Sequence, residues 1–182
     1  MRIVSGKYKS RRFDVPHSFK ARPTTDFAKE NLFNVLSNRM DWEDTLALDL
    51  FSGTGSIAFE LLSRGCREVV CVEKDAAHYA FIKKIKDELK DERLIPMKTD
   101  AFRFIETCGR SFDFVFADPP YSLPELAQLP ELIFKRHLVK PGGLLVLEHP
   151  KEYDFSAWEE FEQQRVYGAV NFSILKENCP KT

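Results

Sequence analysis

The sequence of 182 residues predicts a doubly wound α/β fold, with seven strands in a mostly parallel sheet and helices on both faces. Two observations support this prediction. From Thr45 onward, apolar runs alternate with amphipathic segments, the pattern of parallel strands joined by crossover helices. A glycine-containing loop follows the first apolar run, at the place where such sheets bind ligands.

The alternating part of the chain predicts five strands and four helices. The expected strands are Thr45–Leu50, Glu68–Glu73, Leu94–Lys98, Phe112–Ala117 and Gly143–Glu148, and the expected helices are Ser56–Arg64, Ala76–Leu89, Phe102–Cys108 and Glu125–Leu138. The apolar run at residues 114–117 is typical of a strand buried on both faces. Two further strands, Phe161–Tyr167 and Asn171–Lys176, flank Gly168 and predict an antiparallel hairpin at the sheet edge.

We expect a single domain, 1–182, in three parts: a basic arm (1–25), an N-terminal helix (26–40) and an α/β core (45–182). Two short segments of the arm, 2–4 and 12–15, are candidates for a small β-ribbon around Gly6. In the run Arg22-Pro23-Thr24-Thr25-Asp26, Thr24 or Thr25 can cap the N-terminal helix, and Asp26 suits the positive end of its dipole.

The composition is that of an ordinary globular protein, with 43% hydrophobic and 30% charged residues. No apolar run approaches the roughly 20 residues of a membrane span, and the N-terminus lacks the apolar core of a secretory signal. The four cysteines, Cys66, Cys71, Cys108 and Cys179, form no CxxC pair, which favours reduced thiols over a metal site. We therefore expect a cytoplasmic protein, a monomer without metal or membrane contact.

Charge is distributed unevenly along the chain. The formal net charge is −1, yet residues 1–25 carry +6 and the remainder carries −7. The basic side chains of the arm are Arg2, Lys7, Lys9, Arg11, Arg12, Lys20 and Arg22. Such an asymmetry is expected where one end of a protein meets phosphates, but a solvated terminus would look the same, and charge alone leaves both interpretations open.

The loop after the first strand, Phe51-Ser52-Gly53-Thr54-Gly55, predicts a cofactor site. Its glycines allow close backbone approach to a ligand and positive φ angles. Glu73, at the end of the second strand, is placed to accept hydrogen bonds from two ribose hydroxyls. Gly53, Gly55 and Ala58 also satisfy G-x-G-x-x-A, so a dinucleotide remains an alternative ligand.

Two acidic residues favour S-adenosylmethionine over a dinucleotide. Asp49 can bind the ammonium group of that cofactor, whereas it would repel a pyrophosphate. Asp100-Ala101, after the third strand, resembles the adenine-recognition position of methyltransferases, although Asp100 can equally be the N-cap of the next helix. Phe51 and Phe102 are candidates for stacking on the cofactor.

Asp118-Pro119-Pro120-Tyr121 follows the fourth strand directly and predicts catalysis on a planar amine. Consecutive prolines force the chain out of the sheet in a rigid extended turn. The lone pair of a planar amine is delocalised, and binding both N–H bonds can expose it. The Asp118 carboxylate and the Pro119 carbonyl can be the two acceptors, and Tyr121 can stack on a base swung out of its helix.

These motifs together resemble the RsmD-type 16S ribosomal RNA guanine-N2 methyltransferases. The resemblance extends over the arm residues 2–12, Arg22-Pro23-Thr24-Thr25-Asp26, residues 32–36 of the first helix, the loop 49–55, Glu73-Lys74-Asp75, the tetrapeptide 118–121 and Leu147-Glu148-His149. It implies a class I, Rossmann-like methyltransferase fold.

The resemblance further implies transfer of a methyl group from S-adenosylmethionine to the N2 amine of a guanine in 16S rRNA, within an assembling or assembled small subunit. The arm residues Lys7, Lys9, Arg11 and Arg12 would contact RNA phosphates, and Arg22 would lie near the active site. His149 closes the fifth strand at the ligand-binding edge and is a further candidate for substrate contact.

Other functions share parts of this pattern. An adenine-N6 DNA methyltransferase or a glutamine methyltransferase would use the same tetrapeptide, although the chain shows no evident target-recognition domain. A non-catalytic RNA-binding assembly factor would need none of Gly53, Gly55, Glu73 and Asp118. A nicotinamide-dependent oxidoreductase would use the same glycine loop.

Overall fold

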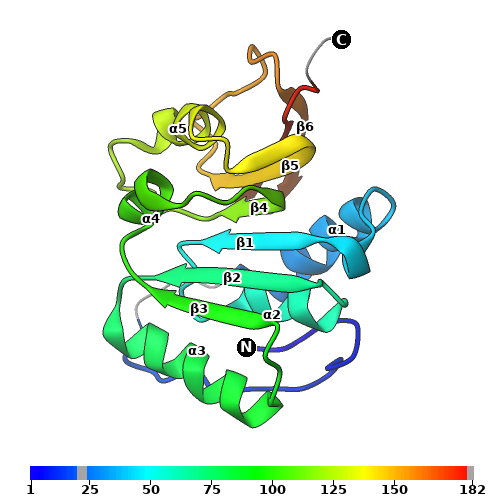
Figure 1. The fold of residues 1–182 in the computed structure, drawn as a ribbon, viewed down its shortest axis with the longest axis vertical. Coiled ribbons are helices and arrows are strands. Elements are labelled where there is room, and N and C mark those ends of the chain that lie inside the picture. Colours follow the sequence, from blue (N-terminus) through cyan, green and yellow to red (C-terminus); the bar gives the residue numbers. More distant parts are fainter. Residues whose placement is uncertain (20–23, 180–182) are drawn as a thin grey trace.

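The computed structural model describes residues 1–19 and 24–179 and shows one sheet of seven strands in the order β3-β2-β1-β4-β5-β7-β6 (Figure 1). Strands β1 to β5 are parallel, and β7 pairs antiparallel with both β5 and β6. The strand bounds are β1 Leu46–Leu50, β2 Glu68–Glu73, β3 Leu94–Lys98, β4 Phe112–Ala117, β5 Val139–His149, β6 Phe161–Tyr167 and β7 Val170–Lys176. The predicted mostly parallel sheet with a C-terminal antiparallel hairpin is confirmed.

The helices cover both faces of the sheet, as a doubly wound fold requires. Helices α1 (Asp26–Ser37), α2 (Ser56–Ser63) and α3 (Ala76–Leu89) pack on one face, and α4 (Ala101–Thr107) and α5 (Leu129–Lys135) on the other. Strand β4 shows the alternation that separates the two cores: Phe114 and Phe116 join the α1–α3 core, and Val115 and Ala117 join the α4–α5 core.

The helix expected at Glu125–Leu138 is divided. The structure has a 3₁₀ turn, η2 (Leu126–Gln128), followed by the shorter α5. Pro130 lacks the N–H that a continuous helix would donate to the carbonyl of Leu126, so a new helix begins with proline near its start. The first helix is also shorter than expected and ends at Ser37, after which 3₁₀ turn η1 (Trp42–Asp44) leads into β1.

Strand β5 begins four residues earlier than the predicted Gly143. Its pairing with β4 passes from Val139 opposite Phe112 to Leu144 opposite Phe114, so the Pro-Gly-Gly segment lies in an irregularity within the strand. Gly142 takes φ +77° there and donates its N–H to the carbonyl of Glu177. Proline followed by two glycines is typical of a turn, but here the segment lies within the strand, where the register shifts.

The basic arm is packed on the body of the protein. Its ribbon is limited to a single antiparallel bridge between Arg2 and Arg12, while Ile3, Tyr8 and Phe13 are buried in the α1–α3 core. The N-terminus and the arm run beneath α2 and α3 in Figure 1. The arm thus contributes to the fold as well as to surface charge.

In the part of the chain that the structure describes, no helix has the length and hydropathy needed to cross a membrane.

Candidate active site

A pocket of about 530 Å³ opens at the carboxyl ends of β1, β2, β4 and β5. Strands β1 and β4 are neighbours in the sheet, but the chain continues from them towards opposite edges, which makes this the topological switch point where α/β folds bind ligands. The pocket lining brings together most of the residues expected from the sequence: Asp49, Phe51, Gly53, Glu73, Asp100, Ala101, Asp118, Pro119 and Tyr121.

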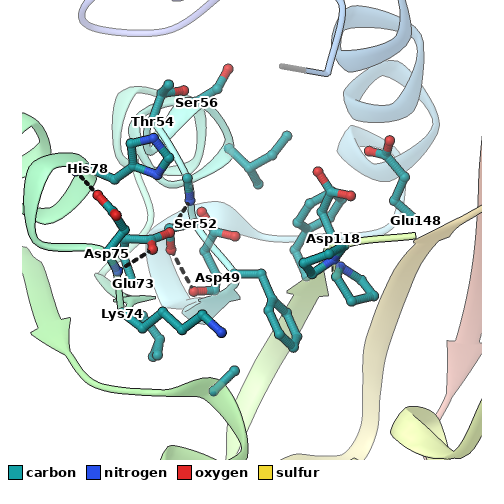
Figure 2. Close-up of a pocket in the computed structure, with 18 of the residues that line it drawn as sticks. Asp49, Ser52, Thr54, Ser56, Glu73, Lys74, Asp75, His78, Asp118 and Glu148 are labelled. Atoms are coloured by element: carbon teal, nitrogen blue, oxygen red, sulfur yellow. Dashed lines mark hydrogen bonds between the residues drawn. The ribbon is translucent and has the colours of Figure 1, made fainter. Parts of the chain in front are cut away.

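Four of the acidic residues that line this pocket lie at the ends of strands, and the alternation of the strands explains why they face it (Figure 2). In each strand, the residue two positions before the acid belongs to the α1–α3 core: Ala47, Cys71, Phe116 and Val146. Because side chains alternate between faces with a period of two, the acids at the strand ends share that face. They are Asp49, Glu73, Asp118 and Glu148.

The loop between β1 and α2 has the backbone geometry predicted for a ligand-binding turn. Gly53 and Gly55 take φ of +54° and +78°. A Cβ on Gly55 would lie 2.9 Å from the ring of Phe59, so packing requires glycine there, whereas a Cβ on Gly53 would meet nothing within 4 Å. Gly53 lines the pocket and Gly55 does not, so Gly53 is the residue whose backbone a ligand can approach.

Phe51 adopts φ +60°, an uncommon conformation for a residue with a side chain. Its ring lines the pocket and packs edge-on against Phe102, with ring centroids 6.2 Å apart. Such a conformation costs on the order of 1–3 kcal/mol and persists where the surrounding structure fixes it, often at functional sites. Phe51 rather than Phe102 lines the pocket.

Glu73 organises the loop that surrounds it. One carboxylate oxygen accepts the Gly53 N–H at 2.7 Å, and the other accepts the Asp75 N–H at 2.8 Å. A carboxylate offers about four lone-pair sites, so these bonds leave acceptor capacity for ribose hydroxyls. The dashed lines in Figure 2 show this network on the β2 side of the pocket.

Asp49 is almost fully buried at the end of β1. Its carboxylate accepts the N–H of Ala58 at 3.1 Å, within the first turn of α2. Burial raises the pKa of Asp49, hydrogen bonds from Ser52 and Ala58 oppose the shift and the nearby Glu73 adds to it, and together these bring the pKa to about 8. A cationic group in the pocket would stabilise the ionised form.

Asp100 caps α4, as the simpler interpretation predicted. Its Oδ1 accepts the N–H groups of Phe102 and Arg103, and its Oδ2 lies 3.8 Å from the Nζ of Lys74. Asp100 and Ala101 both line the pocket, next to the β3 side of the sheet. Capping therefore accounts for one carboxylate oxygen, and contact with an adenine remains a prediction.

The tetrapeptide leaves the sheet at the end of β4 and forms the opposite side of the pocket. Asp118 is half-buried, and desolvation raises its pKa well above the ordinary value, with Glu148 and then Asp49 adding to the shift. Tyr121 is partly exposed and donates its hydroxyl to Glu148 at 3.1 Å. The turn thus presents a carboxylate and an aromatic ring at the pocket surface.

Glu148 is a site residue that the sequence analysis did not single out. It is buried at the end of β5 and accepts hydrogen bonds from Tyr121 and from the Thr24 hydroxyl, the latter at 3.0 Å. The sequence did contain a signal, because Glu148 ends an apolar strand as Asp49 does.

His149, the neighbouring residue that the sequence suggested for substrate contact, does not line the pocket. It is fully buried, its Nε2 lies 2.8 Å from the Ser173 hydroxyl, and its Nδ1 lies 2.9 Å from the Pro150 carbonyl. Being one residue later in the strand, it faces the α4–α5 side, where its ring packs on Tyr153 and Phe155. The expected substrate contact of His149 is therefore not supported, and its role here is structural.

Two basic residues of the arm, Lys7 and Arg11, lie away from the pocket. The Nζ of Lys7 lies 4.0 Å from the carboxylate of Asp91, just after the end of α3. Arg11 pairs with Glu88, in the last turn of the same helix. The crossover helices run antiparallel to the parallel strands, so the C-terminal end of α3 lies near the N-terminal ends of the strands, away from the pocket. Lys9 and Arg12 are exposed on the same arm, and Arg22 lies outside the described residues.

The same fold occurs in solved structures. A hypothetical protein of Thermus thermophilus matches with a TM-score of 0.84 and 30% identity, covering 96% of this chain and 98% of that one. The T. thermophilus 16S rRNA N2 G1207 methyltransferase, solved with AdoMet and guanosine, matches with a TM-score of 0.69 and 20% identity, covering 88% of this chain and 45% of that one. The fold is therefore the one that class I methyltransferases share.

Sequence comparison gives the family. Residues 1–176 match the family described as Conserved hypothetical protein 95. Ribosomal RNA small subunit methyltransferase D of Escherichia coli strain K12 is 34% identical over 183 residues, 98% of this chain and 91% of that protein. The chain belongs to this family, and the resemblance to RsmD-type methyltransferases is confirmed.

Proposed function

We propose that this protein transfers a methyl group from S-adenosylmethionine to the N2 amine of a guanine in small-subunit ribosomal RNA. The observation that carries the proposal is the position of Asp118-Pro119-Pro120-Tyr121, which faces the same pocket as the glycine loop and Glu73. A group held by the tetrapeptide and a cofactor held by the loop would share one cavity. The name of the E. coli relative supports small-subunit rRNA as the substrate.

The donor set of the pocket fits the cofactor. Asp49 and Glu73 are acidic groups next to a glycine whose side-chain position is open, an arrangement suited to an ammonium group and a ribose. A pyrophosphate would meet several carboxylates here, which disfavours the dinucleotide alternative. When bound, S-adenosylmethionine supplies an activated methyl group on a sulfonium.

The residues of the tetrapeptide would hold the amine. The Asp118 carboxylate accepts one N–H and the Pro119 carbonyl accepts the other, which exposes the nitrogen lone pair towards the cofactor side of the pocket. Tyr121, partly exposed, stacks on the extruded base. Rigid placement of these acceptors by the two prolines lowers the entropic part of the barrier. Ionised Asp118 is the stronger acceptor, and burial beside Glu148 holds its pKa well above the ordinary value, so we expect activity to fall as the pH drops through that raised pKa.

The small subunit, in its assembling or assembled form, is the proposed partner, and the cytoplasm its location. The arm would contact RNA phosphates through Lys7, Lys9, Arg11 and Arg12. Lys7 and Arg11 lie near the C-terminal end of α3, away from the pocket, so the RNA footprint would extend over the α1–α3 side of the protein.

Labelled-cofactor transfer tests the proposal. The purified protein is incubated with labelled S-adenosylmethionine and, separately, small-subunit particles, naked 16S rRNA and a glutamine-containing translation-factor protein. We expect label in the rRNA of the particle, and digestion should place it in N2-methylguanosine. Label in N6-methyladenosine, or in protein alone, would overturn the proposal in favour of the corresponding alternative.

A further inference from the structure

Glu148 is the buried acid of the pocket to which the proposed chemistry gives no role. Its side chain is 6% exposed and lines the pocket with Asp118 (Figure 2). Two hydroxyls position it from different elements: Tyr121 donates to Oε1 and Thr24, just before α1, donates to Oε2. A buried carboxylate held in this way is an oriented acceptor facing the substrate side of the pocket.

Glu148 is also close enough to Asp118 for its charge to influence the ionisation of that carboxylate. The two acids end neighbouring strands, β4 and β5, on the same face of the sheet. Both carboxylates line the pocket, and each carboxylate offers about four lone-pair sites. Two such acceptors side by side are complementary to a substrate that presents two neighbouring N–H donors.

Guanine has that pattern. On its Watson–Crick edge the N2 amine stands beside the N1–H, so two adjacent groups donate. In adenine and cytosine the exocyclic amine stands beside a ring nitrogen that accepts, and in a glutamine side chain it stands beside a carbonyl oxygen. A second carboxylate next to the amine acceptor would attract guanine and repel the other three.

We propose that Glu148 is the specificity-determining residue, which accepts the guanine N1–H while Asp118 accepts an N–H of the N2 amine. The inference rests on the proposed function, whose substrate it explains. Specificity then includes a repulsive element, the pairing of a carboxylate with a lone pair in any wrong substrate. A site built to hydrogen-bond one group rejects an analogue lacking it by up to about 10⁴–10⁵-fold.

Replacing the target guanine by 2-aminopurine tests this role, because 2-aminopurine keeps the N2 amine but has a lone pair at N1. Small-subunit particles are reconstituted with either base at the mapped target position, and kcat/KM is measured for each. We expect the protein to prefer guanine by at least about 10³-fold. The variant Glu148→Gln can turn its amide N–H₂ towards N1, so its preference should fall by at least about tenfold relative to the unmodified protein.

Glu106→Gln, an exposed position on α4, is the matched control and should keep the full preference. S-adenosylhomocysteine binding should be equal in all three proteins, which shows that the pocket is intact. An equal rate on both bases with the unmodified protein would overturn the role of Glu148 without need of a variant. An unchanged preference in Glu148→Gln would also overturn it. If neither base is methylated while adenine or protein is, the proposed function itself has failed.

Discussion

At the scale of single residues, the chemistry depends on which face of the sheet a side chain meets. Asp118 and Glu148 lie two residues beyond buried core positions of their strands and so reach the pocket. His149 lies one residue further along β5 and is buried on the opposite side. Motif spacing identified the end of the strand correctly, but a shift of one residue decides which neighbour is functional.

Asp118→Ala should reduce methyl transfer by at least about 10²–10³-fold, because it removes one of the two acceptors for the amine. Cofactor binding should be nearly unchanged, since the residues proposed to hold the cofactor are Asp49, Gly53 and Glu73. Single-turnover rates and calorimetry with S-adenosylhomocysteine measure the two effects. Asp87→Ala, an exposed change on α3, serves as control, and full turnover in Asp118→Ala would remove the proposed role.

The raised pKa of Asp49 leads us to expect proton release when the cofactor binds. Burial raises its pKa to about 8, so at pH 7 the carboxyl is largely protonated before the ligand binds. A bound ammonium group favours the ionised form, so binding at pH 7 should release a proton, and affinity should rise as the pH approaches 8. Calorimetry of S-adenosylhomocysteine binding in buffers of different ionisation enthalpy measures the release. Asp49→Asn should bind more weakly, and the part of the release due to Asp49 should be absent. Identical proton release in this variant would contradict the assignment.

At the scale of elements, hydrogen bonds from backbone N–H groups of the arm hold it to α2. Glu60, fully buried in α2, accepts the N–H groups of Val4 and Ser5, and Lys7 donates its N–H to the Ser63 carbonyl. The sequence predicted a charged arm but not its docking, because the acceptors lie more than 50 residues away in the chain. Periodicity predicted the strands and helices well, but two boundaries differ. Pro130 lacks an N–H donor and so shortens α5, and the pairing of β5 with β4 extends β5 past its irregularity.

Gly6 should be sensitive to substitution for the same reason. A Cβ at this position would lie 1.9 Å from the Ser63 carbonyl oxygen, and its φ is +83°. Gly6→Ala should therefore lower the free energy of unfolding by at least about 2 kcal/mol, the range typical of forced backbone shifts.

Gly168→Ala is the matched control for that change. Gly168 has φ +65°, but a Cβ added there would meet nothing within 4 Å, so only the backbone conformation opposes alanine, at about 1–2 kcal/mol. Urea unfolding of both variants compares them. Equal destabilisation would show that the arm does not pack closely on α2.

At the scale of the whole molecule, part of the positive charge of the arm lies away from the pocket. The pocket opens at the carboxyl ends of the strands, while Lys7 and Arg11 pair with acids near the end of α3. If the arm meets RNA, the substrate must extend past the nucleotide that reacts. The charge asymmetry was evident from the sequence, but its placement relative to the site required the fold.

Lys9 and Arg12, both exposed, should contribute to RNA affinity without contributing to chemistry. In the double variant Lys9→Ala/Arg12→Ala, the slope of log affinity against log salt should become shallower by up to about 2, with kcat unchanged. Filter binding of small-subunit particles over a salt series measures the slope. Lys135→Ala/Arg136→Ala, at the end of α5 across the sheet, is the control, and an unchanged slope in the arm variant would exclude phosphate contact by these two residues.

The most direct test of the central claim is the chemical identity of the methylated product. Small-subunit particles lacking the modification are incubated with S-adenosylmethionine and either the unmodified protein or Asp118→Ala, and the rRNA nucleosides are separated and identified by mass spectrometry. We predict one new N2-methylguanosine per particle with the unmodified protein and a much lower yield with the variant. The appearance of N6-methyladenosine instead, or of N2-methylguanosine in equal amounts with both proteins, would contradict it.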